Sequence, residues 1–150
     1  MRVLLPALFI LMPVLAFAQV KRSNPPTLST PTGYTHIVEV TGPNRTIYIS
    51  GQIAFDKDGK IVGAAGDMKA QAEQVFKNLK AALDAAGATF GDVVKMNSYI
   101  TDMSKAQAVR DVRAQYFKDA TPASTFVEVK GLVRPELLLE IEVIAVTRAQ

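Results

Sequence analysis

The stretch that most constrains the fold is the apolar run Leu137–Val146, which carries two carboxylates, Glu140 and Glu142, among aliphatic residues. Its many β-branched residues predict a strand. Side chains of a strand alternate between two faces, so the two glutamates share one face and the apolar residues between them point to the other. The acidic face either meets water, as is normal for an antiparallel sheet, or directs a carboxylate into a pocket.

A second β-rich run, Ser124–Val129, precedes this strand. The segment between the two runs, Lys130–Pro135, contains the glycine and proline that interrupt strands. This arrangement predicts a closing hairpin, in which Ser124–Val129 and Leu137–Val146 pair with each other.

The N-terminus has the pattern of a secretory signal peptide. A basic residue precedes the apolar run Val3–Ala18, which ends in Ala16-Phe17-Ala18, and Gln19 follows. A permanent membrane anchor is the alternative, but this run contains two prolines and is shorter than the roughly 20 residues that span a bilayer. We expect cleavage after Ala18 and a periplasmic or secreted protein without a membrane partner.

The composition excludes several classes of site. Cysteine is absent, so neither a disulfide nor a thiolate site exists. The formal charge is +3, and loss of Arg2 with the signal peptide lowers it to +2. Because the basic residues are spread among acidic ones, we expect no nucleic-acid partner.

The remainder is long enough for one domain. We expect an extended leader over residues 19–33, which is rich in proline, and a folded domain over residues 34–150. Strands are predicted at 36–40, 46–54 and 92–101, and helices at 67–86 and 104–118. Asp56–Lys60 predicts a hairpin turn. These elements, with the closing hairpin, indicate an α+β domain with both helices on one face of the sheet.

Two local patterns carry detail. Apolar residues recur at helical spacing in the first helix and predict a buried stripe: Met68, Ala72, Val75, Phe76, Leu79 and Leu83. Asp67 is suited to cap this helix, and Gly87 to end it. Gly51 interrupts a strand, which predicts a bulge or a close approach to the backbone.

Elimination narrows the chemistry. The chain has a single histidine, His36, and its acidic residues do not cluster at metal-ligand spacing, so we expect no metal. No motif presents a serine nucleophile, and no glycine-rich loop suits a phosphate or a cofactor. Any chemistry would rest on Glu140, Ser50, Tyr34 and the backbone amides around Gly51.

Several motifs together resemble those of the RidA/YjgF family. They are Ile49-Ser50-Gly51-Gln52-Ile53, Gly91-Asp92-Val93-Val94-Lys95, Asp102-Met103-Ser104, Pro122-Ala123 with Val127-Glu128-Val129, and Glu140-Ile141-Glu142-Val143-Ile144-Ala145-Val146. The resemblance extends from about Tyr34 to Val146, which is nearly all of the expected mature chain.

The resemblance implies a chorismate-mutase-like α+β fold, with a mixed sheet, two helices on one face, and a homotrimer whose sheets form a central barrel. It implies ligand clefts between subunits and hydrolysis of 2-imino acids, such as 2-iminobutanoate and 2-iminopropanoate, to 2-keto acids and ammonia, without a cofactor. Glu140 matches the family glutamate that orients or activates water. Tyr34, Ser50 and Gly51 match the lining of the cleft, although Tyr34 is equally explained as a packing aromatic.

Three positions depart from the family pattern. The family arginine that binds the substrate carboxylate is Ser124 here, which offers one neutral hydrogen bond in place of a charged fork. The family cysteine two positions later is Phe126, which narrows or dries the cleft. Arg110 stands where the family has asparagine. One hypothesis is that Arg110 takes over anion binding; the alternative is an ordinary exposed arginine.

Three classes of function remain. The first is an exported imine or enamine deaminase, or a hydrolase of another small imine or carbonyl compound. The second is a non-catalytic trimer that binds a small molecule, favoured by the loss of the arginine. The third is a protein-interaction or chaperone-like module, which requires an exposed apolar patch. Some family members are called endoribonucleases, but the weak charge and the expected export argue against RNA. Export would also separate the protein from the cytosolic pyridoxal-phosphate enzymes that release imines.

Overall fold

The computed structural model describes residues 18–118 and 120–149, so the expected signal peptide lies, apart from Ala18, outside the described residues. The strands are β1 (Gln19–Ser23), β2 (Ile37–Thr41), β3 (Asn44–Gln52), β4 (Val93–Ile100), β5 (Ala123–Glu128) and β6 (Leu139–Arg148). The helices are α1 (Met68–Ala85) and α2 (Ala106–Tyr116), with short 3₁₀ helices at Phe90–Asp92 and Met103–Lys105. In this part of the chain no helix is long and apolar enough to cross a membrane.

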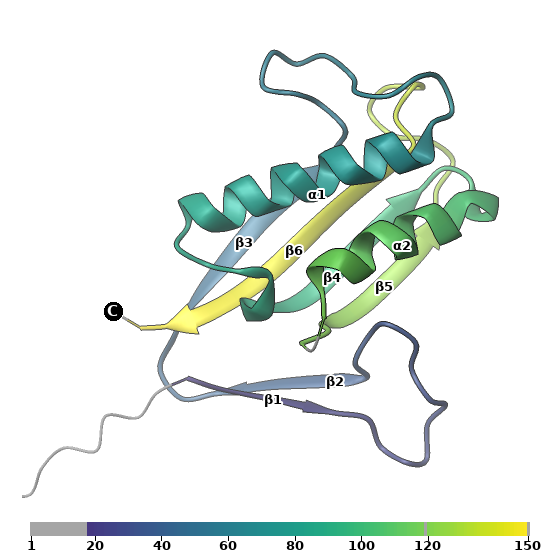
Figure 1. Ribbon diagram of the computed structural model, residues 1–150. Coiled ribbons are helices and arrows are strands. Elements are labelled where there is room, and N and C mark those ends of the chain that lie inside the picture. Colours follow the sequence, from purple (N-terminus) through teal and green to yellow (C-terminus); the bar gives the residue numbers. More distant parts are fainter. Residues whose placement is uncertain (1–17, 119, 150) are drawn as a thin grey trace, which may run out of the picture.

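The main sheet has the strand order β3-β6-β4-β5. β6 is antiparallel to both of its neighbours, whereas β4 and β5 run parallel, so the sheet is mixed. Figure 1 shows both helices on the same face of this sheet, with α1 over β3 and β6 and α2 over β4 and β5. The predicted α+β architecture, with two helices on one face, is confirmed.

The predicted closing hairpin is wrong, because β4 lies between β5 and β6. β4, α2 and β5 form a crossover unit, in which the helix returns the chain so that the second strand runs parallel to the first. β5 thereby occupies an edge of the sheet. The loop after it leads to β6, which enters the sheet between β3 and β4.

The expected leader, residues 19–33, contains β1, which pairs antiparallel with β2. Alternation favours this pairing, since Val20 lies opposite Val40 and Arg22 opposite Val38. The Arg22 guanidinium donates hydrogen bonds to the carbonyls of Gly91 (3.0 Å) and Val93 (3.2 Å). The leader is therefore part of the fold and attached to the domain.

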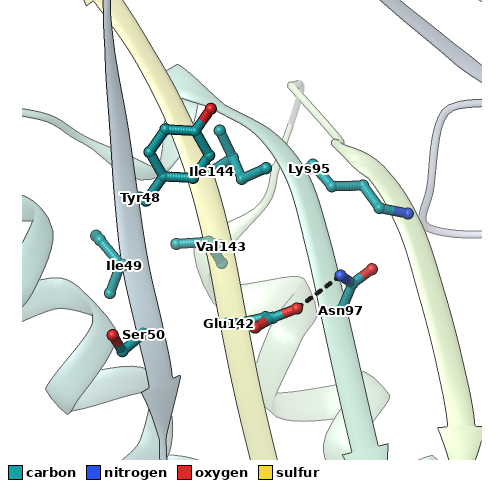
Figure 2. A pocket seen from close by; sticks show the side chains of 8 residues that line it. All are labelled: Tyr48, Ile49, Ser50, Lys95, Asn97, Glu142, Val143 and Ile144. Atoms are coloured by element: carbon teal, nitrogen blue, oxygen red, sulfur yellow. Dashed lines mark hydrogen bonds between the residues drawn. The ribbon is translucent and has the colours of Figure 1, made fainter.

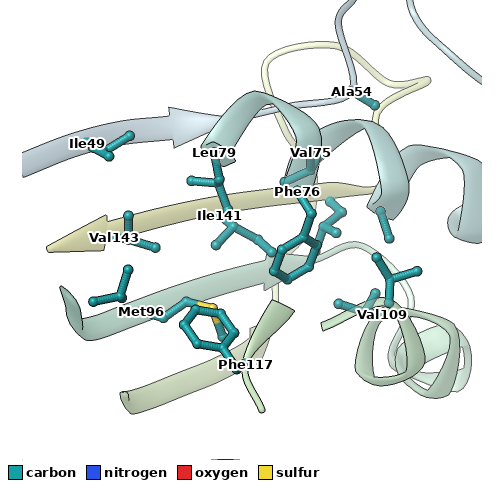
Figure 3. Packing of buried hydrophobic residues seen from close by; sticks show 14 of the residues in the cluster. Ile49, Ala54, Val75, Phe76, Leu79, Met96, Val109, Phe117, Ile141 and Val143 are labelled. Atoms are coloured by element: carbon teal, nitrogen blue, oxygen red, sulfur yellow. The ribbon is translucent and has the colours of Figure 1, made fainter. Parts of the chain in front are cut away.

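The core lies between the sheet and the two helices, as Figure 3 shows. All six residues of the predicted stripe on α1 are buried. Asp67 caps the helix by accepting a hydrogen bond from the Ala70 amide at 3.0 Å, and Gly87 follows the end of the helix with a φ of 65°. From β6, Leu139, Ile141 and Val143 complete this core.

The opposite face of the sheet carries polar side chains, and no helix covers it among the described residues. Glu140 and Glu142 are half-buried on this face, while Leu139, Ile141 and Val143 are buried against the helices. The predicted alternation along β6 is confirmed. We call this side the open face.

Candidate functional site

The feature that positions Glu140 is a β-bulge in β3. Ile49 pairs with Val143, but Gln52 pairs with Ile141, so Ser50 and Gly51 both lie opposite one residue of β6. A Cβ atom on Gly51 would lie 2.8 Å from Cδ and 2.9 Å from Cγ of Glu140. Because glycine has no side chain, the Glu140 carboxylate lies directly against the backbone of the bulge, as the sequence predicted for this glycine.

Beside Glu140, a hydrogen-bonded group of side chains fixes Glu142. Asn97 Nδ2 donates to Glu142 Oε1 at 2.8 Å, and the Tyr99 hydroxyl donates to the same oxygen at 3.1 Å. The hydrogen bond to Glu142, then desolvation, and then the charges of Glu142 and Glu140 raise the pKa of Tyr99 above its ordinary value. Glu142 is thus held by hydrogen bonds from Asn97 and Tyr99, whereas Glu140 has no hydrogen-bond partner among the described residues.

The open face is hollowed next to this group. A depression of about 250 Å³ is lined by Tyr48, Ile49, Ser50, Lys95, Asn97, Glu142, Val143 and Ile144. Figure 2 shows Glu142 and Asn97 facing each other across adjacent strands, with Ser50 on β3. Sequence reasoning did not single out Tyr48, Lys95, Asn97 or Tyr99. The two-residue period of a strand places Lys95, Asn97 and Tyr99 on one face of β4, and this pattern in the sequence could have identified them as a group.

Ser124 and Phe126 lie on the other side of the sheet. Their partners in the parallel β4 strand are Met96 and Ser98, which are buried toward the helices, so both side chains point into the helical layer. Arg110 Cζ on α2 lies 5.9 Å from the centre of the Phe126 ring, within cation–π distance. Ser124 Oγ is buried and has no hydrogen-bond partner among the described residues.

Tyr34 lies near the beginning of β5. The amide of the next residue, Thr35, donates to the Pro122 carbonyl at 3.0 Å, and its hydroxyl donates to the Thr121 carbonyl at 2.9 Å. The Tyr34 ring meets the His36 ring edge-on at a centroid distance of 5.2 Å. Tyr34 therefore lies at the end of the sheet where β5 begins.

The structure thus divides the candidate residues into two groups. Ser50, Gly51 and Glu140 lie on the open face, while Arg110, Ser124 and Phe126 lie in the helical layer, and the sheet separates the two groups within one chain. Among residues 18–118 and 120–149 there is no group of three histidine, cysteine or carboxylate side chains arranged to hold a metal ion.

Known proteins give the same architecture. The family model described as Endoribonuclease L-PSP matches residues 27–147. A crystal structure of a Rid family protein, YyfB from Yersinia pestis, superimposes with a TM-score of 0.77 at 37% identity, covering 84% of this chain and 97% of that one. The chain belongs to the RidA/YjgF family.

Other RidA/YjgF relatives agree. RidA from the Antarctic bacterium Psychrobacter superimposes with a TM-score of 0.62 at 36% identity, covering 78% of this chain and 90% of that one. A RutC family protein of Pyrococcus horikoshii is 44% identical over 100 residues, which are 66% of this chain and 77% of the relative. The family match over residues 27–147 therefore includes the residues of both candidate groups.

Proposed function

We propose that the protein hydrolyses small imines, with 2-imino acids as the first class, in a cleft completed by a second subunit. The observation that carries the proposal is the placement of the Glu140 carboxylate against the Gly51 backbone, without a competing hydrogen-bond partner among the described residues. A carboxylate held in this way is suited to take a proton from water.

The chemistry requires few groups. Water adds to the carbon of the C=N bond while Glu140 accepts its proton and passes it to the nitrogen, which gives a carbinolamine. Glu140 then transfers the hydroxyl proton of the carbinolamine to the nitrogen, and the C–N bond breaks as the C=O bond forms, so that ammonia leaves and a 2-keto acid remains. Such proton transfer contributes roughly 10²–10⁴-fold to the rate. We propose that Ser50 and the amides of the bulge, which are neighbours of Gly51 in β3, hold the substrate.

The division of the residues supports an oligomer, and we propose the homotrimer that the family resemblance implies. One chain presents Glu140 on the open face and Arg110 in the helical layer, so a cleft holding both requires two chains. The open face carries Tyr48 (78% exposed) and Val127 (40% exposed), apolar surface that packing against a second copy would bury. Glu140 and Glu142 on this face also disfavour an RNA backbone, and we propose a small-molecule partner.

Export is proposed on the sequence alone. β1 begins at Gln19, directly after the proposed cleavage point, so removal of residues 1–18 would leave the first strand intact. N-terminal sequencing of the protein from its native source tests this; a mature chain that still begins at Met1 would contradict it.

The test of hydrolysis generates 2-iminopropanoate with an amino-acid oxidase and traps it with semicarbazide. The protein should slow formation of the semicarbazone, and Glu140→Gln should abolish the effect. Glu142→Gln is the matched control, because glutamine still accepts hydrogen bonds from Asn97 and Tyr99; this variant should keep the activity. Equal activity of Glu140→Gln and the unmodified protein would refute the assigned role.

A second candidate is a non-catalytic protein that binds a small molecule. The specific observation in its favour is Ser124, whose buried hydroxyl replaces the charged anchor expected from the family and has no partner among the described residues. Binding of a 2-keto acid with no effect on semicarbazone formation would favour it. A chaperone-like module has less support, because exposed large apolar residues are dispersed over several elements: Leu28, Ile37, Tyr48, Val127 and Val133.

A further inference from the structure

A second hollow, of about 310 Å³, lies between α2 and the loop that precedes β2. It is lined by Thr32, Gly33, Gln107, Arg110, Asp111, Arg113, Ala114 and Phe117. Two arginines one helical turn apart, Arg110 and Arg113, contribute their side chains to it. This hollow is separate from the depression on the open face.

Arg113 is unusually placed for a cation. Its side chain is half-buried, Nη2 donates to the Gly33 carbonyl, and Cζ lies 5.8 Å from the centre of the Phe117 ring. The Nε–H group is buried and has no hydrogen-bond partner among the described residues. Burial, and then the charge of Arg110, lower the pKa of Arg113, although an arginine remains charged at neutral pH.

Within the described part of the chain, no carboxylate pairs with either arginine. The ion pairs found there join Lys57 to Asp58, Lys80 to Asp84, and Arg134 to Glu136. Asp111 also lines the hollow, but its carboxylate accepts a hydrogen bond from Gln107 Nε2 at 2.7 Å. Because a partly desolvated guanidinium without a counter-ion is unfavourable, this arrangement favours binding of an anion from outside the described residues.

The position of Ser124 gives this hollow a role. In the crossover from β4 to β5, α2 runs opposite to β5, and Arg110 packs over Phe126. One turn further along α2 therefore corresponds to an earlier position on β5, toward Ser124. Arg113 Nε and Ser124 Oγ, the two buried side-chain atoms without a partner among the described residues, thus lie toward the same end of the crossover.

We propose that Arg113, assisted by Arg110, binds the carboxylate of a small monocarboxylic acid. The inference rests on the proposed function and deepens it, since the charged anchor comes from the helix where Ser124 has removed it from the strand. The fork of a guanidinium suits a planar carboxylate. Two guanidinium charges and the Asp111 carboxylate leave one positive charge in the hollow, which matches a monoanion better than a dianion.

The test is a titration followed by NMR, with the Nε–H signals of the arginines as the readout. Propanoate should shift the Arg113 Nε signal, whereas propanamide, which has the same shape without the charge, should not. Arg113→Lys keeps the charge but loses the fork and should weaken propanoate binding about tenfold or more. Lys77→Gln, an exposed cation on α1, is the matched control for loss of charge and should bind as the unmodified protein does.

Arg110→Gln provides a second test in case Arg113→Lys disturbs the contact with Gly33. Arg110 is exposed and makes no hydrogen bond to the backbone of the described residues, so this variant should fold and should bind propanoate several-fold more weakly. An Arg113 signal that does not respond to propanoate would overturn the proposal. Tighter binding of inorganic phosphate would overturn the ligand class, and a signal that shifts with protein concentration alone would assign the arginines to a second copy of the chain.

The outcome is independent of hydrolysis. Propanoate binding is read from the Arg113 signal and hydrolysis from semicarbazone formation, so the two results are measured separately. A failed imine assay therefore leaves the result on the carboxylate site valid, and failed propanoate binding leaves the result on hydrolysis valid.

Discussion

Replacement of Gly51 by alanine tests the contact on which the proposed site depends. The added Cβ would overlap the Glu140 carboxylate, so this side chain must leave its conformation. An unfavourable side-chain conformation costs about 0.5–1.5 kcal/mol. In the opposite direction, alanine at a compatible backbone position stabilises by about 0.4–1 kcal/mol, because it restricts the unfolded chain. The φ angle of Gly51 is not positive, so the backbone accepts alanine.

When Glu140 is present, the two effects of Gly51→Ala on stability nearly cancel, and a double-mutant cycle separates them. In the Glu140→Ala background the overlap is gone, so Gly51→Ala should stabilise by the full gain of about 0.4–1 kcal/mol. The coupling free energy between the two positions is then about 0.5–1.5 kcal/mol. In the Glu142→Ala background, which serves as the control, Gly51→Ala should have the same effect as in the unmodified protein.

Urea unfolding of the four variants of the cycle, at one protein concentration, measures the coupling. A coupling below about 0.3 kcal/mol would show that the sites are independent and that the Glu140 carboxylate does not lie against Gly51. Hydrolysis in the semicarbazide assay should fall in Gly51→Ala without a loss of stability. An unchanged rate would show that hydrolysis does not depend on the contact between Glu140 and Gly51.

Three further predictions follow from the described contacts. Phe76→Ala, at a fully buried position, should lower the free energy of unfolding by about 3–5 kcal/mol, seen as a lower urea midpoint with an unchanged slope. Asp67→Ala should cost about 1 kcal/mol, because the Ala70 amide loses its cap; an unchanged midpoint would contradict the capping role. Since the pKa of Tyr99 is raised in the folded state, its contribution to stability should be complete below pH 10, the ordinary pKa of tyrosine, and be lost as the pH rises through the folded pKa. Ultraviolet titration of the phenolate should show a lower Tyr99 pKa in Glu142→Ala, which removes the acceptor, and no change would refute the hydrogen bond as its cause.

Much of the fold was readable from local patterns. The stripe on α1 and its cap follow from helical periodicity and from the hydrogen-bonding capacity of Asp67, and both are local properties. The alternation along β6 follows from the two-residue period of a strand, which does not depend on the partners of that strand. Gly51 was identified as a point of close approach because a glycine inside a strand rarely has another purpose.

Strand pairing was not readable in the same way. The predicted hairpin between Ser124–Val129 and Leu137–Val146 assumed that neighbours in sequence pair, but α2 returns β5 parallel to β4 and leaves the inner position to β6. For the same reason, the leader was not recognised as a strand, since its partner β2 lies beyond a proline-rich loop. No local feature of these segments specifies which strands pair with each other.

The candidate site shows the same limit. Family resemblance named Glu140, Ser50 and Arg110, but only the arrangement of the strands decides that the first two share the open face while Arg110 lies across the sheet. Arg113 was not identified at all, because its significance comes from burial and from the absence of a described counter-ion, not from its position in a motif. Sequence by itself determined which faces of each element are apolar, because that depends on the period of the element. The tertiary structure alone decided which polar groups meet and which are left without a partner, because contacts between distant segments depend on packing.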